Sequence, residues 1–468
     1  MKKFARTISG VTPVAVMARP MKCPGECVYC PSFPNTPRSY TPASPAVLRA
    51  ISCGFDAKKQ VQSRLRMLGE MGHPTDKVEL IVMGGTFLAC PEDYQYQFIK
   101  DCLDGLNGEE SADLEEAKRL NQTAQRRCTG LCIETRPDWC RQEEIERMLR
   151  FGATRVELGV QTLDEEIYRL IKRGHGVEAV VSATAKLREH GFKVHYHWMP
   201  GLPGSSPERD LELTRELFAD QRFRPDGLKL YPTMVVSGTE LERWYQEKRY
   251  QPYSPETLIG LMAGIKCIVP RYVRISRVLR DIPARFITAG CRDSLRGPIK
   301  QRMKQAGLEC KCIRCREYGH RVRDGWAVGE PRLVRLDYEA ADGREVFLSF
   351  EDEAETLFGL LRMRVSPLGS GGNSALIREL HVYGPEVPLS QQNEEAAQHK
   401  GLGRALLQEA ERIAAEEFRV NVMRVLSGIG AREYYADFGY HLEGDYMLKG
   451  LGERGGNLSP IEPHPRPL

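Results

Sequence analysis

The sequence has no long apolar run and no dense, evenly spread cysteine framework. Its N-terminus, Met1-Lys2-Lys3-Phe4-Ala5-Arg6, lacks the apolar segment of a signal peptide, and no other stretch has the apolar length needed to span a bilayer. The fourteen cysteines are spread thinly over 468 residues except for two tight groups. Such groups in a large chain indicate metal sites in a reducing compartment. We therefore expect a cytoplasmic protein with no membrane partner.

Acidic residues are scarce in two segments of an otherwise balanced chain. Before residue 67 eleven basic side chains accompany only Glu26 and Asp56, and a second basic run extends from Arg271 to Arg323. The net charge of the whole chain is only +4, so these blocks stand out by their position rather than by their sum. Two basic blocks predict a surface that binds a polyanion, and a solvated surface is the alternative.

Three thiols lie within eight residues, at Cys23, Cys27 and Cys30. Their spacing lets one turn point all three sulfurs at a single centre. A [4Fe–4S] cluster held by three cysteines keeps one iron available to an outside ligand, and its low potential suits one-electron chemistry. The alternative is a structural zinc knuckle without its fourth ligand, although structural zinc sites are normally closed by four ligands.

This loop resembles the signature of the radical S-adenosylmethionine (SAM) enzymes. The spacing is CxxxCxxC, and an aromatic residue, Tyr29, precedes the last cysteine. The resemblance implies that the open iron binds the amino and carboxylate groups of SAM. It also implies that one electron splits this cofactor into methionine and a 5′-deoxyadenosyl radical.

Strand-like and helix-like stretches alternate from the buried strand Val14-Ala15-Val16-Met17 as far as Ser276, among them a predicted strand at residues 77–83 and a predicted helix at residues 207–219. Repeated β-α alternation predicts a parallel sheet with helices outside it, either open or closed into a barrel. The resemblance to radical SAM enzymes selects a partial (β/α) barrel. Working groups in such folds lie at the C-terminal ends of the strands.

The residues at and after the ends of two predicted strands supply the candidate contacts for SAM. Paired glycines after the second strand let a ligand approach the backbone, which fits the glycine-rich contact of the family. Glu157 and Gln161 end the fourth strand, and Arg173 follows it. A structural hydrogen bond at the barrel rim is the alternative for each of these three. The predicted cofactor contacts of this domain are Gly84, Gly85, Thr86, Glu157, Gln161 and Arg173.

Two histidines of the fifth predicted strand, His195 and His197, have no companion at metal-ligand spacing in the sequence. We expect them to be rim or core residues.

A second cysteine group, Cys310, Cys312 and Cys315, places three thiols within six residues. Cys291 and His320 are the candidates for a fourth ligand. A closed zinc site would stabilise this basic, loop-rich segment. A second iron–sulfur cluster and ordinary thiols are the alternatives.

After Arg332 the pattern changes to four strands followed by an amphipathic helix at Arg404 to Phe418. The order resembles the GCN5-related N-acetyltransferases (GNAT), whose cofactor loop matches Gln-x-x-Gly-x-Gly here. In this loop the glycines leave backbone N–H groups at a helix N-terminus open to the pyrophosphate of acetyl-CoA. The loop residues are Gln398, His399, Lys400, Gly401, Leu402 and Gly403. The resemblance also implies that Tyr434 or Tyr435 protonates the departing CoA thiolate.

The combination of these parts resembles the family of Elongator catalytic subunits in a stand-alone prokaryotic form. The stretches Ile377-Arg378-Glu379-Leu380-His381-Val382-Tyr383-Gly384 and Arg432-Glu433-Tyr434-Tyr435 add to the likeness. It implies that acetyl-CoA and SAM together yield 5-carboxymethyluridine at the wobble position of tRNA. An anticodon loop is single-stranded, so its base can be splayed into a cleft while basic blocks hold the phosphates. A homodimer fits this form, and no obligate accessory subunit is expected.

A chain of 468 residues with 41% hydrophobic residues is too long for a single hydrophobic core, so we expect two or three domains. The predicted fold class is α/β: a partial radical-SAM barrel followed by a GNAT α+β domain, joined by a zinc-binding linker. The expected bounds are 1–285 for the barrel, 286–330 for the linker, 331–450 for the GNAT domain and 451–468 for a disordered tail.

Two other functions remain open from the sequence. One is a protein lysine acetyltransferase with a structural cluster, in which Glu379 would be the general base. The other is a tRNA-binding scaffold without turnover, which would need blocked cofactor sites.

Overall fold

The computed structural model describes residues 10–367, 373–384, 401–452 and 464–465. Three residues of the predicted acetyl-CoA loop, Gln398, His399 and Lys400, lie outside these ranges. So does most of the predicted disordered tail, although His464–Pro465 pairs with a strand of the second sheet as β17. No helix within the described ranges is long and apolar enough to cross a membrane.

The first sheet has seven strands in the order β1-β2-β3-β4-β5-β6-β8, and every neighbouring pair is parallel. The sheet is open, and the strand order follows the chain, as successive β-α-β crossovers produce. This confirms the alternation predicted from the sequence. The strands are β1 (Thr12–Met17), β2 (Lys77–Met83), β3 (Arg127–Thr135), β4 (Arg155–Gln161), β5 (Lys193–Trp198), β6 (Gly227–Leu230) and β8 (Arg274–Val278).

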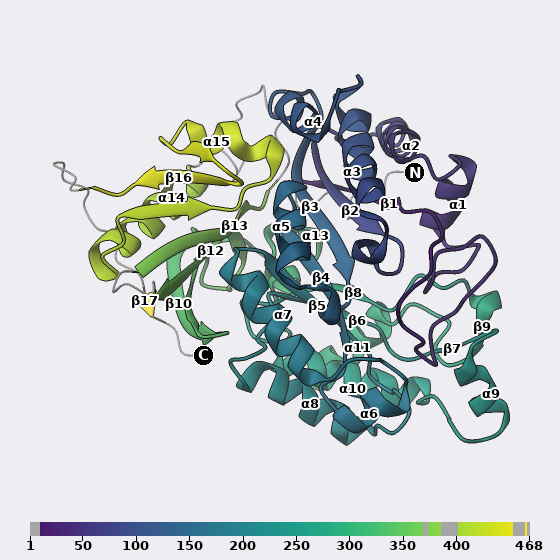
Figure 1. The fold of residues 1–468 in the computed structure, drawn as a ribbon. Coiled ribbons are helices and arrows are strands. Elements are labelled where there is room, and N and C mark those ends of the chain that lie inside the picture. Colours follow the sequence, from purple (N-terminus) through teal and green to yellow (C-terminus); the bar gives the residue numbers. More distant parts are fainter. Residues whose placement is uncertain (1–9, 368–372, 385–400, 453–463, 466–468) are drawn as a thin grey trace.

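Helices cover the outer side of this sheet, with α3, α5 and α7 in front of it in Figure 1. Local sequence sets where several of them begin: the side chains of Asp56, Ser206 and Ser254 accept hydrogen bonds from backbone N–H groups of the first turn. The helices are α1 (Pro45–Ser52), α2 (Ala57–Glu70), α3 (Glu92–Asn107), α4 (Leu114–Asn121), α5 (Gln142–Arg150), α6 (Glu165–Leu170), α7 (Val177–Glu189), α8 (Pro207–Ala219), α9 (Glu240–Gln246) and α10 (Pro255–Ile268).

Three helices occupy the predicted linker, and a separate two-stranded sheet precedes them. The helices are α11 (Arg296–Gln305), α12 (Ile313–Arg316) and α13 (Tyr318–Arg323), and the small sheet pairs β7 (Val235–Val236) with β9 (Ile287–Ala289).

The second sheet has eight strands in the order β15-β16-β14-β13-β12-β11-β10-β17. The sequence predicts its first four strands but not the final hairpin of β15 and β16, whose first strand is exposed along its whole length. The elements are β10 (Arg332–Ala340), β11 (Gly343–Glu351), β12 (Leu357–Pro367), β13 (Asn373–Val382), α14 (Leu402–Arg412), β14 (Val422–Val425), α15 (Arg432–Ala436), β15 (His441–Glu443) and β16 (Tyr446–Gly450). A π-helical turn, Ile413–Glu417, extends α14.

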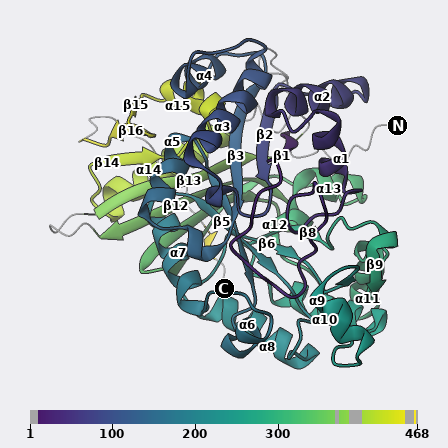
Figure 2. The ribbon, with the colours of Figure 1, turned by 45° about the vertical axis from the view of Figure 1, so that its right-hand side comes forward.

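Buried charges join the two sheets, which lie side by side in both views (Figure 1 and Figure 2). Arg378 of β13 contacts Asp226 before β6 at 2.8 Å and Glu345 of β11 at 2.7 Å. Arg188 of α7 contacts Glu345 at 2.9 Å. These side chains are at most 1% exposed, so each charge is compensated inside the protein. The network therefore fixes the relative position of the two sheets.

Candidate active site

One cavity of about 1090 Å³ lies between the two sheets and is lined by residues of both. At the end formed by the first sheet it contacts the loop of Cys23, Cys27 and Cys30. At the other end it contacts Gly401, Gly403 and the helix that carries Tyr434. The two candidate cofactor sites are therefore the two ends of a single space.

The three cysteines follow β1 on a loop whose conformation depends on one glycine. The Cys30 N–H donates to the Cys27 carbonyl at 3.0 Å, and the Gly25 N–H donates to the Cys23 sulfur at 3.4 Å. A side chain at Gly25 would collide with the guanidinium of Arg136. The glycine therefore lets the loop and this arginine share one end of the cavity.

Arginine charge favours the thiolate form of Cys27. Burial alone would raise the pKa of Cys27, but Arg173, which donates a hydrogen bond to its sulfur at 3.3 Å, outweighs burial and lowers the pKa. Burial and the negative charge of Cys27 raise the pKa of Cys30. The positive charge of a metal centre would compensate this repulsion and let all three cysteines bind as thiolates.

The glycines predicted to contact SAM come directly after β2. Gly84 and Gly85 have φ angles of 143° and 78°, and a side chain at Gly84 would come within 2.9 Å of the Ala18 Cβ. The next residue, Thr86, places its hydroxyl 3.6 Å from the Cys23 sulfur. The structure thus brings this segment beside the cysteine loop, as the prediction requires.

Unpartnered polar atoms lie near the cysteines. Gln161 Oε1, Arg136 Nη1 and Arg173 Nε are buried, have no hydrogen-bond partner within the protein, and belong to residues that line the cavity. Such atoms are rare in folded proteins unless a ligand or water satisfies them. Gln161 also has a φ angle of 75°, a left-handed conformation uncommon for glutamine. Donors and acceptors of this kind fit the amino and carboxylate groups of a bound amino acid.

Glu157, the third predicted contact for SAM, belongs to a network of charges. Its carboxylate contacts the Lys229 ammonium and accepts a hydrogen bond from His197 Nε2 at 3.1 Å. Glu134 joins the network through Lys229 at 2.7 Å. Burial would raise the pKa of Glu157, but Lys229 and then His197 lower it well below its usual value. The negative charge of Glu157 is therefore already compensated by its neighbours within the protein.

His197 has companions that the sequence does not reveal. Its ring nitrogen and carboxylate oxygens of Glu134 and Glu157 lie within 4.8 Å of one another, a separation suited to a metal ion. Lys229 contacts both carboxylates, and its ammonium supplies the positive charge that a metal would bring. The expectation that His197 is a rim residue fits this arrangement. Lys229 itself was missed, although a lysine within the apolar run of β6 signals a buried partner.

The end of the cavity at Gly401, Gly403 and Tyr434, named the acetyltransferase end after the resemblance given above, is built mostly from backbone. Strand β13 pairs with the parallel strand β14 only at Ala375–Ile377, and the residues of β13 that follow have no pairing with β14. The residues of β13 after this point, from Glu379 to Val382, line the cavity. A parallel strand that leaves its neighbour exposes backbone N–H and C=O groups to a ligand.

Of the predicted acetyl-CoA loop, the described part is Gly401, Leu402 and Gly403. Gly401 has a φ angle of 72° at the start of α14, and Gly403 packs so closely that an added Cβ would lie 2.7 Å from the Tyr434 hydroxyl. Leu402 is buried in the core of the second sheet, so only its backbone can reach a cofactor. The N-terminus of α14 therefore presents N–H groups with no side chain in front of them.

The two candidate tyrosines occupy different environments. Tyr434 is 39% exposed and reaches over Gly403, whereas Tyr435 is 6% exposed and packs edge-on against Tyr440 in the core. Burial raises the pKa of Tyr434 to about 12, which keeps its hydroxyl protonated. Tyr434 therefore has the more accessible hydroxyl of the two, whereas the ring of Tyr435 packs in the core.

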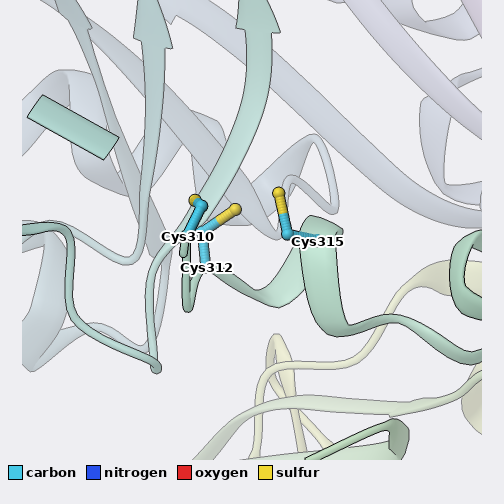
Figure 3. Close-up of side chains that lie close together, drawn as sticks. All are labelled: Cys310, Cys312 and Cys315. Carbon is cyan, nitrogen blue, oxygen red and sulfur yellow. The ribbon is translucent and has the colours of Figure 1, made fainter. Parts of the chain in front are cut away.

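The second cysteine group lies in the linker, before and within α12 (Figure 3). The sulfurs of Cys310, Cys312 and Cys315 lie within 4.8 Å of one another. Neither Cys291 nor His320 joins this set, and the Cys291 thiol donates to the Asp293 carbonyl instead. The predicted fourth ligand is thus not among these two as the structure places them.

A lysine of α10 stands beside the linker thiols. The ammonium of Lys266 lies 3.3 Å from the Cys310 sulfur and 3.6 Å from the Cys315 sulfur. This partner could not be predicted from the sequence, because Lys266 is 44 residues from Cys310, the nearer of the two.

The two basic blocks of the sequence meet at the cavity. Arg280 of the second block donates to the Ser39 hydroxyl at 2.8 Å, next to Arg38 of the first block. The lining arginines from both blocks are Arg38, Arg49, Arg64, Arg274, Arg277, Arg280 and Arg314. Their convergence favours a polyanion site over a merely solvated surface.

Family models match two segments of the chain: the radical SAM superfamily at residues 20–217 and the radical SAM C-terminal domain at residues 225–305. A protein of Dehalococcoides mccartyi named tRNA uridine(34) acetyltransferase is 62% identical over 96% of this chain and 100% of that protein. Human Elongator complex protein 3 is 43% identical over 96% of this chain and 86% of that protein.

A solved structure also matches almost the whole chain. The archaeal Elp3 of Methanocaldococcus infernus with an N-terminal deletion superposes with a TM-score of 0.84 and 45% identity, covering 95% of this chain and 100% of that one. The predicted half-barrel followed by a C-terminal domain is thereby confirmed. This chain belongs to the radical SAM superfamily and, within it, to the family of the tRNA uridine(34) acetyltransferases and Elongator complex protein 3.

Proposed function

We propose that this protein is a cytoplasmic tRNA-modifying acyltransferase that forms 5-carboxymethyluridine at the wobble uridine from acetyl-CoA and SAM. The observation that carries the proposal is the single cavity that reaches from the cysteine loop to Gly401 and Tyr434. Chemistry that begins at one cofactor and ends on another needs both in one enclosed space. The name of the relative that is 62% identical supports the same activity.

At the cysteine end, Cys23, Cys27 and Cys30 would hold a [4Fe–4S] cluster, and the unpartnered atoms of Gln161 and Arg173 would contact SAM. The cluster supplies the electron for one-electron cleavage of SAM. Arg173 orients Cys27 and compensates its charge. The network of Lys229, Glu134 and Glu157 keeps the wall beside them rigid, because one ammonium contacts both carboxylates.

At the other end, the N-terminus of α14 would bind the pyrophosphate of acetyl-CoA, and the divergent part of β13 would hold its acyl arm. The acetyl methyl group then points into the shared cavity. Uracil C5 is a weak nucleophile for ordinary acyl transfer, whereas a carbon radical derived from the methyl group can add to it. Tyr434, whose hydroxyl lies over Gly403, would supply a proton to the CoA sulfur.

The arginines around the cavity would hold the anticodon stem-loop by its phosphates while the wobble base enters. We propose that the linker thiols bind zinc, because a tetrahedral site with Zn–S bonds of about 2.3 Å needs sulfurs about 3.8 Å apart, well within their 4.8 Å limit. Replacing Cys312 with Ala should then remove zinc and lower the melting temperature, while iron bound by the N-terminal loop remains.

A lysine acetyltransferase is the competing function, and the state of Glu379 argues against it. The carboxylate of Glu379 contacts Arg362 at 2.8 Å and Lys193 at 3.5 Å. Burial would raise the pKa of Glu379, but Lys193 and Arg362 lower it far below its usual value. A carboxylate held in this way is a poor base for removing a proton from a lysine ammonium.

The test is anaerobic turnover by the reconstituted protein. We expect 5′-deoxyadenosine in amounts that depend on acetyl-CoA and tRNA, together with 5-carboxymethyluridine in digested tRNA by mass spectrometry. Reactions that omit acetyl-CoA, tRNA or reductant are the controls. Acetylation of a protein substrate without 5′-deoxyadenosine would favour the competing function.

A further inference from the structure

The proposed reaction needs a base that activates water, and none of the residues assigned so far has this role. After the acyl carbon is attached to uridine, the thioester to CoA must be hydrolysed to leave a carboxymethyl group. This inference therefore rests on the proposed function. Water is a weak nucleophile at neutral pH, so a positioned base with a suitable proton affinity accelerates the attack.

Carboxylates among the described lining residues are already committed to cations. Each has a basic partner within 3 Å, and a carboxylate held by a cation loses proton affinity. The pairs are Glu79 with Arg155, Glu134 and Glu157 with Lys229, Asp281 with Arg277, and Glu379 with Arg362. None of these five is suited to take a proton from water.

Three histidines line the cavity within the described ranges, and two belong to strand β5 of the barrel. His195 is 4% exposed and packs tightly on Gly227, and burial lowers its pKa to about 3. His197 donates to the carboxylate of Glu157 and belongs to the Lys229 network. Neither is at the acetyltransferase end. The third histidine, His381, lies on β13.

His381 lines the cavity on the segment of β13 that we propose to hold the acyl arm. It follows the last pairing of β13 with β14 at Ile377, on the open edge of the strand. Alternation along β13 places Glu379, His381 and Tyr383 on one face. The ring of His381 lies 4.4 Å from that of Tyr383, and its charge contributes to the lowered pKa of Glu379, so the three side chains are neighbours.

The partners of these neighbours show that this face is turned toward the barrel. Glu379 contacts Lys193 of β5, and Tyr383 accepts a hydrogen bond from Arg274 of β8 at 3.3 Å. Leu380 and Val382, on the opposite face of β13, pack against the core beneath α14 and also line the cavity. His381 is thus directed into the shared space, where a uridine joined to the acyl arm would be.

We propose that His381 is the general base that activates water for hydrolysis of the CoA thioester. The imidazole removes one proton from water, and the oxygen attacks the thioester carbonyl carbon. The C–S bond breaks, and the CoA thiolate takes a proton from Tyr434. The acyl group leaves as the carboxylic acid, which passes the second proton of the water to the tyrosinate of Tyr434 and becomes the carboxylate, while the imidazolium releases its proton to solvent. No electron is exchanged. Glu379, two residues earlier, stabilises the imidazolium by its negative charge.

The test compares wild-type enzyme with His381→Gln in single-turnover reactions with SAM, acetyl-CoA and tRNA under anaerobic conditions. We expect 5′-deoxyadenosine to form at the wild-type rate, while 5-carboxymethyluridine formation falls by ~100-fold or more. Intact tRNA should then carry the mass of an acyl-CoA adduct on uridine. Added imidazole should release CoA from that adduct.

His441→Gln is the matched control, because His441 lies on β15 with a side chain 68% exposed and does not line the cavity. His381→Asn is the second variant should the glutamine disturb folding, which melting temperature and cluster absorbance report. Carboxymethyluridine at the wild-type rate, or loss of 5′-deoxyadenosine together with the product, would overturn the proposal. A wild-type enzyme that makes no carboxymethyluridine at all refutes the proposed function and, with it, this role.

Discussion

The two ends of the cavity use different parts of the polypeptide. At the cysteine end, charged side chains form the wall: Arg173 contacts the Cys27 sulfur, and Lys229 joins two carboxylates. At the acetyltransferase end, the wall is backbone, with Gly401 and Gly403 at a helix start and an open strand edge. One end therefore presents charged side chains in fixed positions, and the other presents backbone groups that no side chain covers.

This difference matches the chemistry of the two cofactors that we propose. The amino acid part of SAM carries both signs of charge next to a metal centre, so its site needs side chains of fixed position and sign. The pyrophosphate of CoA is bound well by several N–H groups at a helix N-terminus, which any Cβ would obstruct. Removing a side chain should therefore damage the first end, and adding one should damage the second.

The largest effect is expected from Cys27→Ala at the cysteine end. Loss of one of three cysteine ligands should abolish the cluster, because no other described cysteine lies in this loop. We expect iron content, visible absorbance and 5′-deoxyadenosine formation to fall to background, while acetyl-CoA still binds in calorimetry. Cys53→Ala, at a partly buried cysteine away from the cavity, is the control. If the Cys27 variant still cleaved SAM, the cluster would not depend on this loop, and the contrast between the two ends of the cavity would be wrong.

The second effect concerns the network that holds the ends together. Asp226→Ala removes one of the two buried carboxylates that compensate Arg188 and Arg378 and leaves only Glu345, which should cost about 3–5 kcal/mol of unfolding free energy. Burial would raise the pKa of Asp226, but Arg188 and then Arg378 hold it well below its usual value. Its contribution is therefore present above the unfolded pKa of about 3.9 and is lost as pH falls below it.

Denaturant unfolding at pH 7 and at acidic pH checks this prediction. The loss on substitution should be large at pH 7 and smaller at low pH. Glu353→Gln, whose side chain is 84% exposed, is the control and should change stability by less than about 0.5 kcal/mol. Equal losses for both variants at pH 7 would contradict the role of the network.

A smaller effect is expected from Gly403→Ala at the acetyltransferase end. The new Cβ lies 2.7 Å from the Tyr434 hydroxyl, which must move, and it covers part of the helix start. We expect the KM for acetyl-CoA to rise by ~10-fold, equal to about 1.4 kcal/mol, with SAM cleavage chemistry intact. Gly297→Ala is the matched control, because no atom lies within 4 Å of a Cβ at that glycine of α11. An unchanged KM would mean that the helix start does not bind the cofactor.

Local patterns predicted the elements and the chemistry-bearing loops well. The strand at residues 77–83 and the helix at 207–219 have the predicted bounds, since a period of two or a Ser-Pro start determines them locally. The cysteine loop and the paired glycines also lie where the β-α order places them. Each of these depends only on residues close together in the chain.

What the sequence could not provide are the long-range charge partners. Asp226 and Arg378 are 152 residues apart, and Lys266 reaches a thiol 44 residues away. Such pairs depend on which elements pack against each other. The periodicity of a single sequence shows which face of an element is buried, but not which element covers that face. The companions of His197 were hidden for the same reason, because Glu157 comes from the neighbouring strand.

The smallest effect distinguishes the two tyrosines of the acetyltransferase end. Tyr434→Phe removes the hydroxyl above Gly403 and should slow CoA release roughly fivefold, below the ~100-fold of a typical general acid, because a thiolate leaves without obligatory protonation. Tyr435→Phe keeps the ring that packs on Tyr440 and should leave the rate unchanged. Thiol release in single-turnover reactions measures both. If Tyr435→Phe slowed thiol release more than Tyr434→Phe, the buried Tyr435 would be the proton donor. The acetyltransferase end would then depend on a buried side chain as well as on backbone and glycine.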